Sequence, residues 1–421
     1  MVKKEGVIMS RFIEHFKMNE DDILEYVSEK INYFDKNSKL NVREIGDGNI
    51  NYVFKVWDSN SKKSLIIKHA DKLLRSSGRE LDVDRNRIEA NVLKEQYKEC
   101  PTIVPKVYLY DPVMCTIVME DISEYSNLRK ELLERKTFPK LADDISSFIV
   151  NTTVSTTDIF LDSDVKKRKV AKYINGDLCK ISEDLVFTEP YIDYKGRNII
   201  SEENLEFIKQ NIYNDDRLLL EAGKLKNNFM NNAQALLHGD LHSGSIFVNQ
   251  NGTKVLDPEF AFYGPIGYDL GNVVGNLFFA WINARVTEQD EKKLEVFESW
   301  ISATIEDVVD LFKDKFVRYY ENKVTDVLAK NTGYMEWYLG EILSDTAGSV
   351  GLEIIRRVVG DSKVVDITGI EDKDDRIKAE RLLITLGKEM IMNRGAIVNG
   401  KDYVNLLKNN SKKNYQKFNL S

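Results

Sequence analysis

Cysteine and histidine are both scarce in this chain of 421 residues, which contains three cysteines and four histidines. The cysteines, Cys100, Cys115 and Cys179, are widely spaced and include no Cys-x-x-Cys pair. An odd, scattered set of this kind disfavours a disulfide framework and a structural zinc site, and it is typical of a reducing compartment. We therefore expect a cytoplasmic protein.

Long apolar runs and an excess of positive charge are also missing. No stretch of 18 apolar residues occurs, and residues 1–10 carry charges without the apolar core of a signal peptide, so we expect neither a membrane span nor secretion. The net charge of -8 argues against nucleic acid or an anionic membrane as the main partner. The apolar content of 42% and charged content of 30% are typical of a soluble globular protein.

Hydrophobic periodicity divides the chain into a β-rich part and a helical part, which predicts an α+β fold. Residues 42–68 and 107–119 alternate in the manner of antiparallel strands, and residues 12–36 and 85–98 have helical spacing. From about residue 128 the pattern is mainly helical, interrupted by a β-type region at 236–263. Later helices are predicted at 273–281, 288–313, 315–330, 334–359 and 375–392.

A glycine-containing segment, residues 46–53, reads Gly-x-Gly-x-x-Asn-x-Val and includes Gly46, Gly48 and Asn51. Glycines allow backbone N–H groups to approach phosphate oxygens closely. The alternative interpretation is an ordinary hairpin turn. The segment lacks the Lys-Ser/Thr of a Walker loop and the third glycine of a dinucleotide-binding fingerprint.

Two further segments of the β-rich part could contact a nucleotide. Lys68 ends an apolar strand and would need a carboxylate partner, for which Glu89 on the next predicted helix is the candidate. The alternative is a solvated strand end. Glu120, Asp121 and Ile122 follow another strand, where extended backbone could offer a carbonyl and an N–H to an adenine edge. A polar turn is the alternative there.

The segment Leu-His-Gly-Asp-Leu-His-Ser-Gly-Ser, residues 237–245, contains the strongest candidate for catalysis, Asp240. A carboxylate on a loop can orient a substrate hydroxyl and accept its proton during phosphoryl transfer. His238 and His242 are expected to brace the loop by hydrogen bonds, because no third ligand lies near enough to complete a metal site.

Asp257 and Glu259 flank Pro258 just after a strand-like run. In an extended chain their side chains would project to one face, and two carboxylates suit Mg²⁺ that bridges phosphates. The apolar residues around them disfavour the alternative of a solvated turn.

Paired arginines, Arg356 and Arg357, come late in an apolar helical run. Neighbouring side chains on a helix diverge by roughly 100°, so both reach one ligand only near a helix end or in a cleft. They could contact an anion or a sugar, or simply favour the helix C-terminus.

Together these motifs resemble the kinase-like superfamily that includes aminoglycoside phosphotransferases and choline kinases, and within it the methylthioribose kinases. The resemblance extends from about residue 12 to 408 and is carried by residues 46–54, Lys68, residues 120–122, 238–246 and 257–271, and the paired arginines. It implies a two-lobed protein-kinase-like fold, with an ATP-binding lobe over residues 1–122, a hinge near 120–122 and a helical catalytic lobe over residues 123–421.

The resemblance also implies an activity: transfer of the ATP γ-phosphate to the 1-hydroxyl of 5-methylthioribose in methionine salvage, by a Mg²⁺-dependent homodimer. ATP would be held by the glycine segment with Gly46, Gly48 and Asn51, by Lys68 with Glu89, and by Glu120, Asp121 and Ile122. Asp240 would contact the sugar hydroxyl. Asp257, Pro258 and Glu259 would hold Mg²⁺ and phosphates, and at least one of Arg356 and Arg357 would contact the sugar.

Two departures from the wider superfamily favour this subgroup. Ser245 stands where antibiotic and choline kinases usually carry a metal-binding Asn, and Glu259 stands where they often carry Asp. The chain also contains no Arg-Asp dipeptide, so a protein substrate is not expected.

Two alternatives stay open at this stage. One is a related phosphotransferase acting on an aminoglycoside, choline or another amine, although paired arginines would repel such cations. The other is a nucleotide-binding pseudokinase, although Lys68, Asp240 and Asp257 are all intact.

Overall fold

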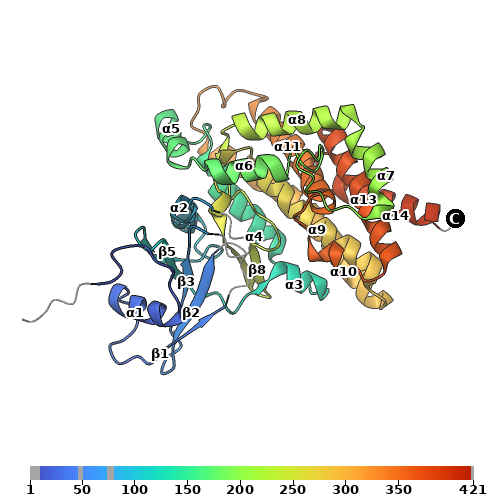
Figure 1. The fold of residues 1–421 in the computed structure, drawn as a ribbon. Helices are drawn as coiled ribbons and strands as arrows, with labels where there is room; N and C mark the ends of the chain where they lie inside the picture. The colour runs from blue at the N-terminus through green and yellow to red at the C-terminus, as the bar shows by residue number, and fades with distance from the viewer. Residues whose placement is uncertain (1–9, 46–50, 74–79, 419–421) are drawn as a thin grey trace, which may run out of the picture. The chain divides into compact units, whose positions relative to one another are not determined.

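The computed structural model describes residues 10–45, 51–73 and 80–418, and the chain forms two compact units. The first comprises Met1–Pro101 and Pro105–Ser123, and the second comprises Thr102–Val104 and Glu124–Ser421. The expected α+β class is confirmed, because the first unit contains an antiparallel sheet and the second is mainly helical (Figure 1). The elements of the first unit are β1 (Leu40–Glu44), β2 (Tyr52–Asp58), β3 (Ser64–His69), β4 (Val107–Asp111), β5 (Thr116–Glu120), α1 (Glu20–Lys30) and α2 (Asp84–Glu99).

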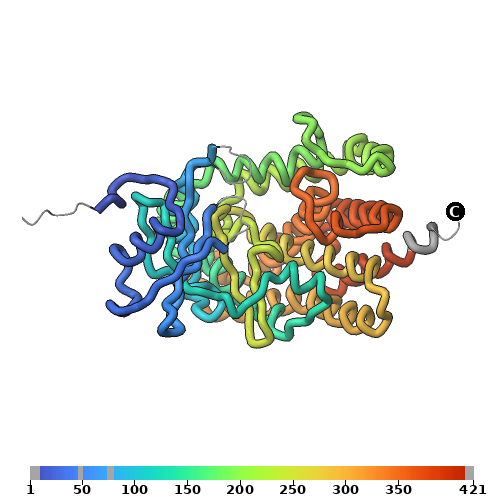
Figure 2. Tube along the Cα trace, turned by 60° about the horizontal axis from the view of Figure 1, so that its bottom comes forward, coloured from blue at the N-terminus to red at the C-terminus, as the bar shows by residue number. Residues whose placement is uncertain are grey.

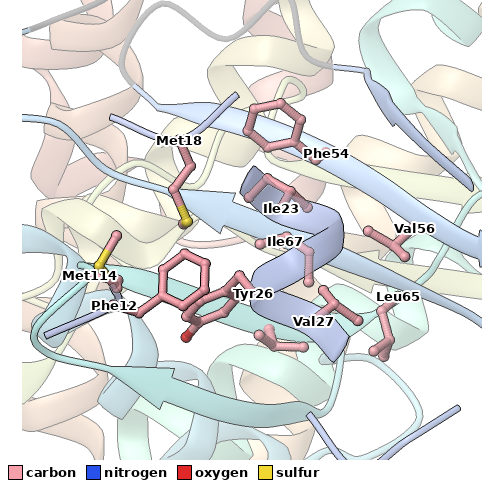
Figure 3. Packing of buried hydrophobic residues seen from close by; sticks show 11 residues of the cluster. Phe12, Met18, Ile23, Tyr26, Val27, Phe54, Val56, Leu65, Ile67 and Met114 are labelled. Carbon is pink, nitrogen blue, oxygen red and sulfur yellow. The ribbon is translucent and has the colours of Figure 1, made fainter. Parts of the chain in front are cut away.

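The sheet of the first unit has the order β1-β2-β3-β5-β4, with every neighbouring pair antiparallel. Side chains alternate between its faces, so Leu65 and Ile67 of β3 point to one face and Ile66 and Lys68 to the other. On the first face, α1 completes a core cluster with β2 and β3 (Figure 3). On the second face, Ile66 packs with Ala90 of α2. The alternation therefore directs Lys68 toward α2.

Helix α1 is shorter than the predicted helix over residues 12–36, because it starts only at Glu20. Asn19 and Asp22 form a capping box, in which each side chain accepts the backbone N–H of the other residue at 3.0 and 2.9 Å. Such a box sets the first helical turn. Phe12 and Met18 are buried in the core ahead of the helix, which explains their apolar spacing.

The second unit is built mainly from long helices, of which α9, α10, α11 and α13 pack together. Figure 2 shows them in the yellow-to-red part of the tube. None of the helices in the described ranges combines the length and apolar character that a membrane crossing needs. Its helices and strands are α3 (Leu128–Leu133), α4 (Leu141–Phe148), α5 (Ser163–Lys172), α6 (Gly176–Leu185), α7 (Leu205–Ile208), α8 (Asp216–Asn231), α9 (Gly267–Thr287), α10 (Glu291–Lys323), α11 (Tyr334–Val359), α12 (Val365–Thr368), α13 (Lys373–Met392), α14 (Gly400–Phe418), β6 (Ser126–Asn127), β7 (Ala235–Leu236), β8 (Ile246–Asn249), β9 (Gly252–Val255) and β10 (Tyr263–Gly264).

Most of the predicted helix boundaries in this unit are wrong, whereas α11 coincides with the predicted range 334–359. Helix α9 ends at Thr287 and not at 281, α10 extends from Glu291 to Lys323 and not from 288 to 330, and α13 starts at Lys373 and not at 375. The predicted break at residue 314 is absent, because α10 contains no glycine or proline that would interrupt it. Helix α9 starts six residues before the predicted residue 273, at Gly267. Its first turns contain buried polar residues that bond to other segments, so apolar periodicity does not reveal them.

The backbones of α9 and α11 approach closely at Gly271. A Cβ atom added there would lie 2.5 Å from Cβ of Ser349 and 2.8 Å from the carbonyl oxygen of Thr346. This approach allows Asn276 of α9 to donate a hydrogen bond to Glu353 of α11 at 3.0 Å. The contact between these helices therefore depends on a residue without a side chain.

We predict that Gly271→Ala lowers the free energy of unfolding by about 1–3 kcal/mol, because backbone and Cβ atoms of α11 must shift to admit the methyl group. The matched control is Gly340→Ala in α11, where an added Cβ meets nothing within 4 Å. That control should raise the free energy of unfolding by about 0.5–1 kcal/mol, because alanine favours helix over glycine. Urea unfolding followed by circular dichroism measures both, and a Gly271→Ala variant as stable as the wild type would contradict the prediction.

Candidate active site

The loop between β7 and β8 carries Asp240, and Asp269 at the start of α9 fixes its backbone. The fully buried carboxylate of Asp269 accepts the N–H of His238 at 2.7 Å and that of Gly239 at 3.0 Å. Gly239 has a φ of 84°, and a Cβ there would lie 2.2 Å from the carbonyl oxygen of Phe260. Only glycine fits this position, because it tolerates both the positive φ and the close approach.

Both histidines of the loop brace it by hydrogen bonds, as predicted. His238 Nε2 lies 2.8 Å from the carbonyl oxygen of Leu256, and His238 Nδ1 accepts the N–H of Asp240 at 3.3 Å. Burial lowers the pKa of His238 to about 4, so its ring is neutral at physiological pH. His242 Nδ1 accepts the N–H of Gly244 at 2.9 Å.

The Asp240 side chain is 27% exposed and lies between the imidazole ring of His242 and the guanidinium group of Arg356. Its Oδ2 is 3.3 Å from His242 Nε2, and its Oδ1 is 3.7 Å from Arg356 Nη2. Burial acts to raise the pKa of the Asp240 carboxyl, but the neighbouring histidine and arginines outweigh burial and hold this pKa well below its usual range. An ionised carboxylate at this position can accept a hydrogen bond from a substrate hydroxyl.

Arg356 and Arg357 converge on one buried carboxylate, that of Glu353. Arg356 Nε donates to Glu353 Oε2, and Arg357 Nε donates to Glu353 Oε1 at 2.9 Å. This is possible because residues three and four positions apart lie on one side of a helix. Beyond the carboxylate the guanidinium groups diverge, and Arg357 Nη1 donates to the carbonyl oxygen of Ser362 at 3.2 Å. Arg356 is therefore the arginine beside Asp240.

The expectation of extended chain from Asp257 to Glu259 is wrong. Asp257 adopts a left-handed conformation with φ 66° and ψ 45°, and Pro258–Phe260 form one turn of 3-10 helix. The turn is held by Asn175, whose Nδ2 donates to the carbonyl oxygens of Glu259 at 2.8 Å and Ala261 at 3.1 Å. The argument that strand alternation puts both carboxylates on one face therefore does not apply.

The donor set of this turn suits Mg²⁺ bound together with phosphates. Among the described residues, no group of three or more histidine, cysteine or acidic side chains could hold a metal. Mg²⁺ typically uses one or two protein carboxylates and takes its other ligands from phosphate and water. Asp257 and Glu259 match that pattern and do not form an all-protein metal cage.

In the first unit, the expected pairing of Lys68 with Glu89 is present. The Nζ–Oε1 distance is 2.7 Å, and both side chains are buried. Asn51 is also buried, and its Oδ1 accepts from Arg85 Nη2 at 3.2 Å. Gly46 and Gly48 lie outside the described residues.

The segment 120–122 has some of its polar groups engaged within the first unit. The N–H of Glu120 donates to the carbonyl oxygen of Lys106 at 2.9 Å. The Asp121 carboxylate accepts from Lys55 Nζ at 2.7 Å and from Ser64 Oγ at 2.6 Å. The Asp121 side chain thus connects β2 and β3. An adenine contact in this segment would have to use other backbone groups, such as the Glu120 carbonyl or the Ile122 N–H.

Sequence reasoning assigned no role to Asp269, Asn276 or Glu353. Each is a polar residue inside an otherwise apolar helical run, Asp269 and Asn276 in α9 and Glu353 in α11. All three are buried and bonded to other polar groups. Buried polar side chains are rarely left unpaired, so an isolated polar residue in an apolar run was the available signal.

Known proteins resemble this chain over most of its length. Residues 202–300 match the phosphotransferase enzyme family, APH. A methylthioribose kinase of Geobacillus sp. strain WCH70 is 37% identical over 375 residues, which cover 89% of this chain and 91% of that protein. One of Geobacillus thermodenitrificans strain NG80-2 is 39% identical over 376 residues, covering 89% and 92%. Among solved structures, a choline kinase from Cryptosporidium parvum Iowa II has a TM-score of 0.47 at 14% identity, covering 92% of this chain and 99% of that one.

We predict that Asp269→Asn lowers the free energy of unfolding by about 1–3 kcal/mol, because an amide has one acceptor oxygen and leaves one buried N–H unbonded. The matched control is Asp345→Asn in α11, whose carboxylate accepts from Asn228 Nδ2 at 2.7 Å. An amide oxygen can accept the same bond, so the control should stay within about 0.5 kcal/mol of the wild type. Equal stability of the two variants in urea unfolding would show that Asp269 does not secure the loop.

Proposed function

We propose a reaction for this chain on the basis of its family. The chain belongs to the methylthioribose kinase family. It transfers the γ-phosphoryl group of ATP to the 1-hydroxyl of 5-methylthioribose, which yields 5-methylthioribose 1-phosphate and ADP in methionine salvage. The structural observation that carries this proposal is the Asp240 carboxylate beside Arg356. The Asp240 carboxylate can accept the proton of a substrate hydroxyl, and the Arg356 guanidinium group can donate a hydrogen bond to a neighbouring oxygen of the substrate.

Asp240 orients the attacking hydroxyl. Its carboxylate accepts a hydrogen bond from the 1-hydroxyl, which directs an oxygen lone pair toward the γ-phosphorus. The new O1–P bond forms as the bond from phosphorus to the ADP oxygen breaks, and the hydroxyl proton passes to Asp240. Most of the catalysis in such a transfer comes from positioning and electrostatic stabilisation, which suits a carboxylate whose surroundings are fixed.

The first unit supplies the nucleotide site in this proposal. Lys68, positioned by Glu89, contacts the phosphates together with Asn51. Glu120, Asp121 and Ile122 form the hinge that contacts adenine. The buried Lys68–Glu89 pair supports this role, because the carboxylate fixes the position of the charged Lys68 ammonium group. Residues 1–122 are accordingly proposed as the ATP-binding lobe and residues 123–421 as the catalytic lobe.

Asp257 and Glu259 would hold Mg²⁺, with Pro258 shaping the turn between them. When bound, the ion neutralises phosphate charge. The support for this assignment is the pair of carboxylates on a turn that Asn175 anchors.

Arg356 is the arginine that we propose for the sugar. Its Nη2 is buried, makes no hydrogen bond within the described part of the chain, and lies 3.7 Å from the carboxylate that orients the hydroxyl. Arg357 donates instead to a backbone carbonyl. We assign Arg357 to holding Glu353 and the end of α11.

The alternative functions are less well supported. Arg356 beside Asp240 would repel the cationic amines of choline and aminoglycosides. A pseudokinase would be expected to have lost Lys68, Asp240 or Asp257, and all three are present. The homodimer and the cytoplasmic location stay predictions.

We predict that the purified chain releases ADP from Mg-ATP with 5-methylthioribose, and not with ribose, choline or kanamycin. Asp240→Asn should lower kcat by roughly 10²–10⁴-fold, because an amide cannot accept the proton. Asp374→Asn is the matched control, since Asp374 is exposed in the first turn of α13, and it should leave kcat unchanged. Turnover on an amine would contradict the substrate, and ATP binding without turnover on any acceptor would favour the pseudokinase.

A further inference from the structure

The imidazole ring of His242 is fixed against Gly244. The N–H of Gly244 donates to His242 Nδ1 at 2.9 Å. A Cβ atom added to Gly244 would lie 2.6 Å from Cε1 and 2.9 Å from Nδ1 of this ring. The ring therefore occupies the space that any other residue at position 244 would fill, and its place in the loop is determined by the backbone.

Two backbone hydrogen bonds fold the loop so that this ring faces Asp240. The N–H of His242 donates to the carbonyl oxygen of Asp240 at 3.0 Å, and the N–H of Ser245 donates to that of His242 at 2.9 Å. Ser245 Oγ also donates to the carbonyl oxygen of Asp240 at 3.0 Å. Ser245, which stands where related kinases carry a metal-binding Asn, is thus engaged in holding the turn.

The hydrogen bond from Gly244 determines the tautomer of His242. Because Nδ1 accepts an N–H, the proton of the neutral ring resides on Nε2. Nε2 lies 3.3 Å from Asp240 Oδ2, so the ring directs a donor at this carboxylate. Asp240 Oδ1 faces Arg356 Nη2 at 3.7 Å. Each carboxylate oxygen therefore faces its own nitrogen group, His242 Nε2 on one side and Arg356 Nη2 on the other.

We propose that His242 is a positioning residue for the phosphoryl transfer, whose Nε2–H holds the Asp240 carboxylate in the orientation that receives the sugar hydroxyl. This inference rests on the proposed function and extends it to a residue beyond the carboxylate itself. A purely structural role for His242 would use only Nδ1 and the Gly244 N–H. The two roles therefore depend on different nitrogen atoms of one ring.

Two substitutions separate these roles. His242→Asn places an amide oxygen near the position of Nδ1, which keeps the acceptor for Gly244 and removes the donor to Asp240. His242→Gln places an amide N–H₂ near the position of Nε2, which keeps the donor and removes the acceptor. Steady-state kinetics with Mg-ATP and 5-methylthioribose, together with urea unfolding, measure both variants against the wild type.

We expect His242→Asn to lower kcat by roughly 100-fold, the loss typical of a misplaced catalytic group, with wild-type stability and an unchanged KM for ATP. His242→Gln should retain most of the wild-type kcat and lose stability. Gly244→Ala should lower kcat in the same way as His242→Asn, because the added methyl group would displace the imidazole ring of His242.

The outcomes distinguish this inference from the proposed function. A wild-type chain that does not phosphorylate 5-methylthioribose contradicts the function itself. An active wild type with a fully active His242→Asn variant overturns the positioning role, because the loop brace alone would then suffice. A rise in KM for ATP with unchanged kcat would also overturn it, since the ring would then act on the nucleotide.

Discussion

The rest of the site depends on the ion pairs that the buried carboxylate of Glu353 forms with Arg356 and Arg357. Glu353 is 1% exposed and accepts hydrogen bonds from Arg356, Arg357 and Asn276. Burial acts to raise its pKa, but the two arginines outweigh burial and keep the pKa below its usual value. An unpaired buried carboxylate would be strongly destabilising, so the folded state requires both arginines to point at this one group.

The consequences of this pairing extend through two helices to the catalytic loop. Asn276 of α9 donates to Glu353 and accepts from Ser243 Oγ at 3.0 Å and from Arg129 Nη2 at 3.0 Å. Ser243 belongs to the same loop as Asp240, so the loop is connected to Glu353 through Asn276 on one side and through Arg356 on the other. The close approach of α9 and α11 makes both connections possible. Fixed surroundings of this kind are what a reaction that depends on positioning requires.

Much of the fold and part of the site could be predicted from the sequence. Strand alternation identified the sheet of the first unit, and the need of Lys68 for a carboxylate partner identified Glu89 on the next helix. The segment of residues 237–245 identified the loop of Asp240. The start of α1 was missed because Phe12 and Met18 are core residues outside a helix. Asp257 and Glu259 were misjudged because a left-handed residue followed by a 3-10 turn has no apolar period. The network around Glu353 joins residues far apart in the chain, and no local pattern reports such contacts.

The most direct test of this account is the KM for 5-methylthioribose in Arg356→Lys compared with Arg357→Lys. Lysine keeps the charge but lacks the planar group that reaches Glu353 and the neighbourhood of Asp240 together. The account predicts that Arg356→Lys raises this KM by roughly 10–100-fold, the loss of one charge-assisted hydrogen bond, and that Arg357→Lys raises it much less. An equal or larger effect of Arg357→Lys would contradict the claim that Glu353 aims Arg356 at the transfer site.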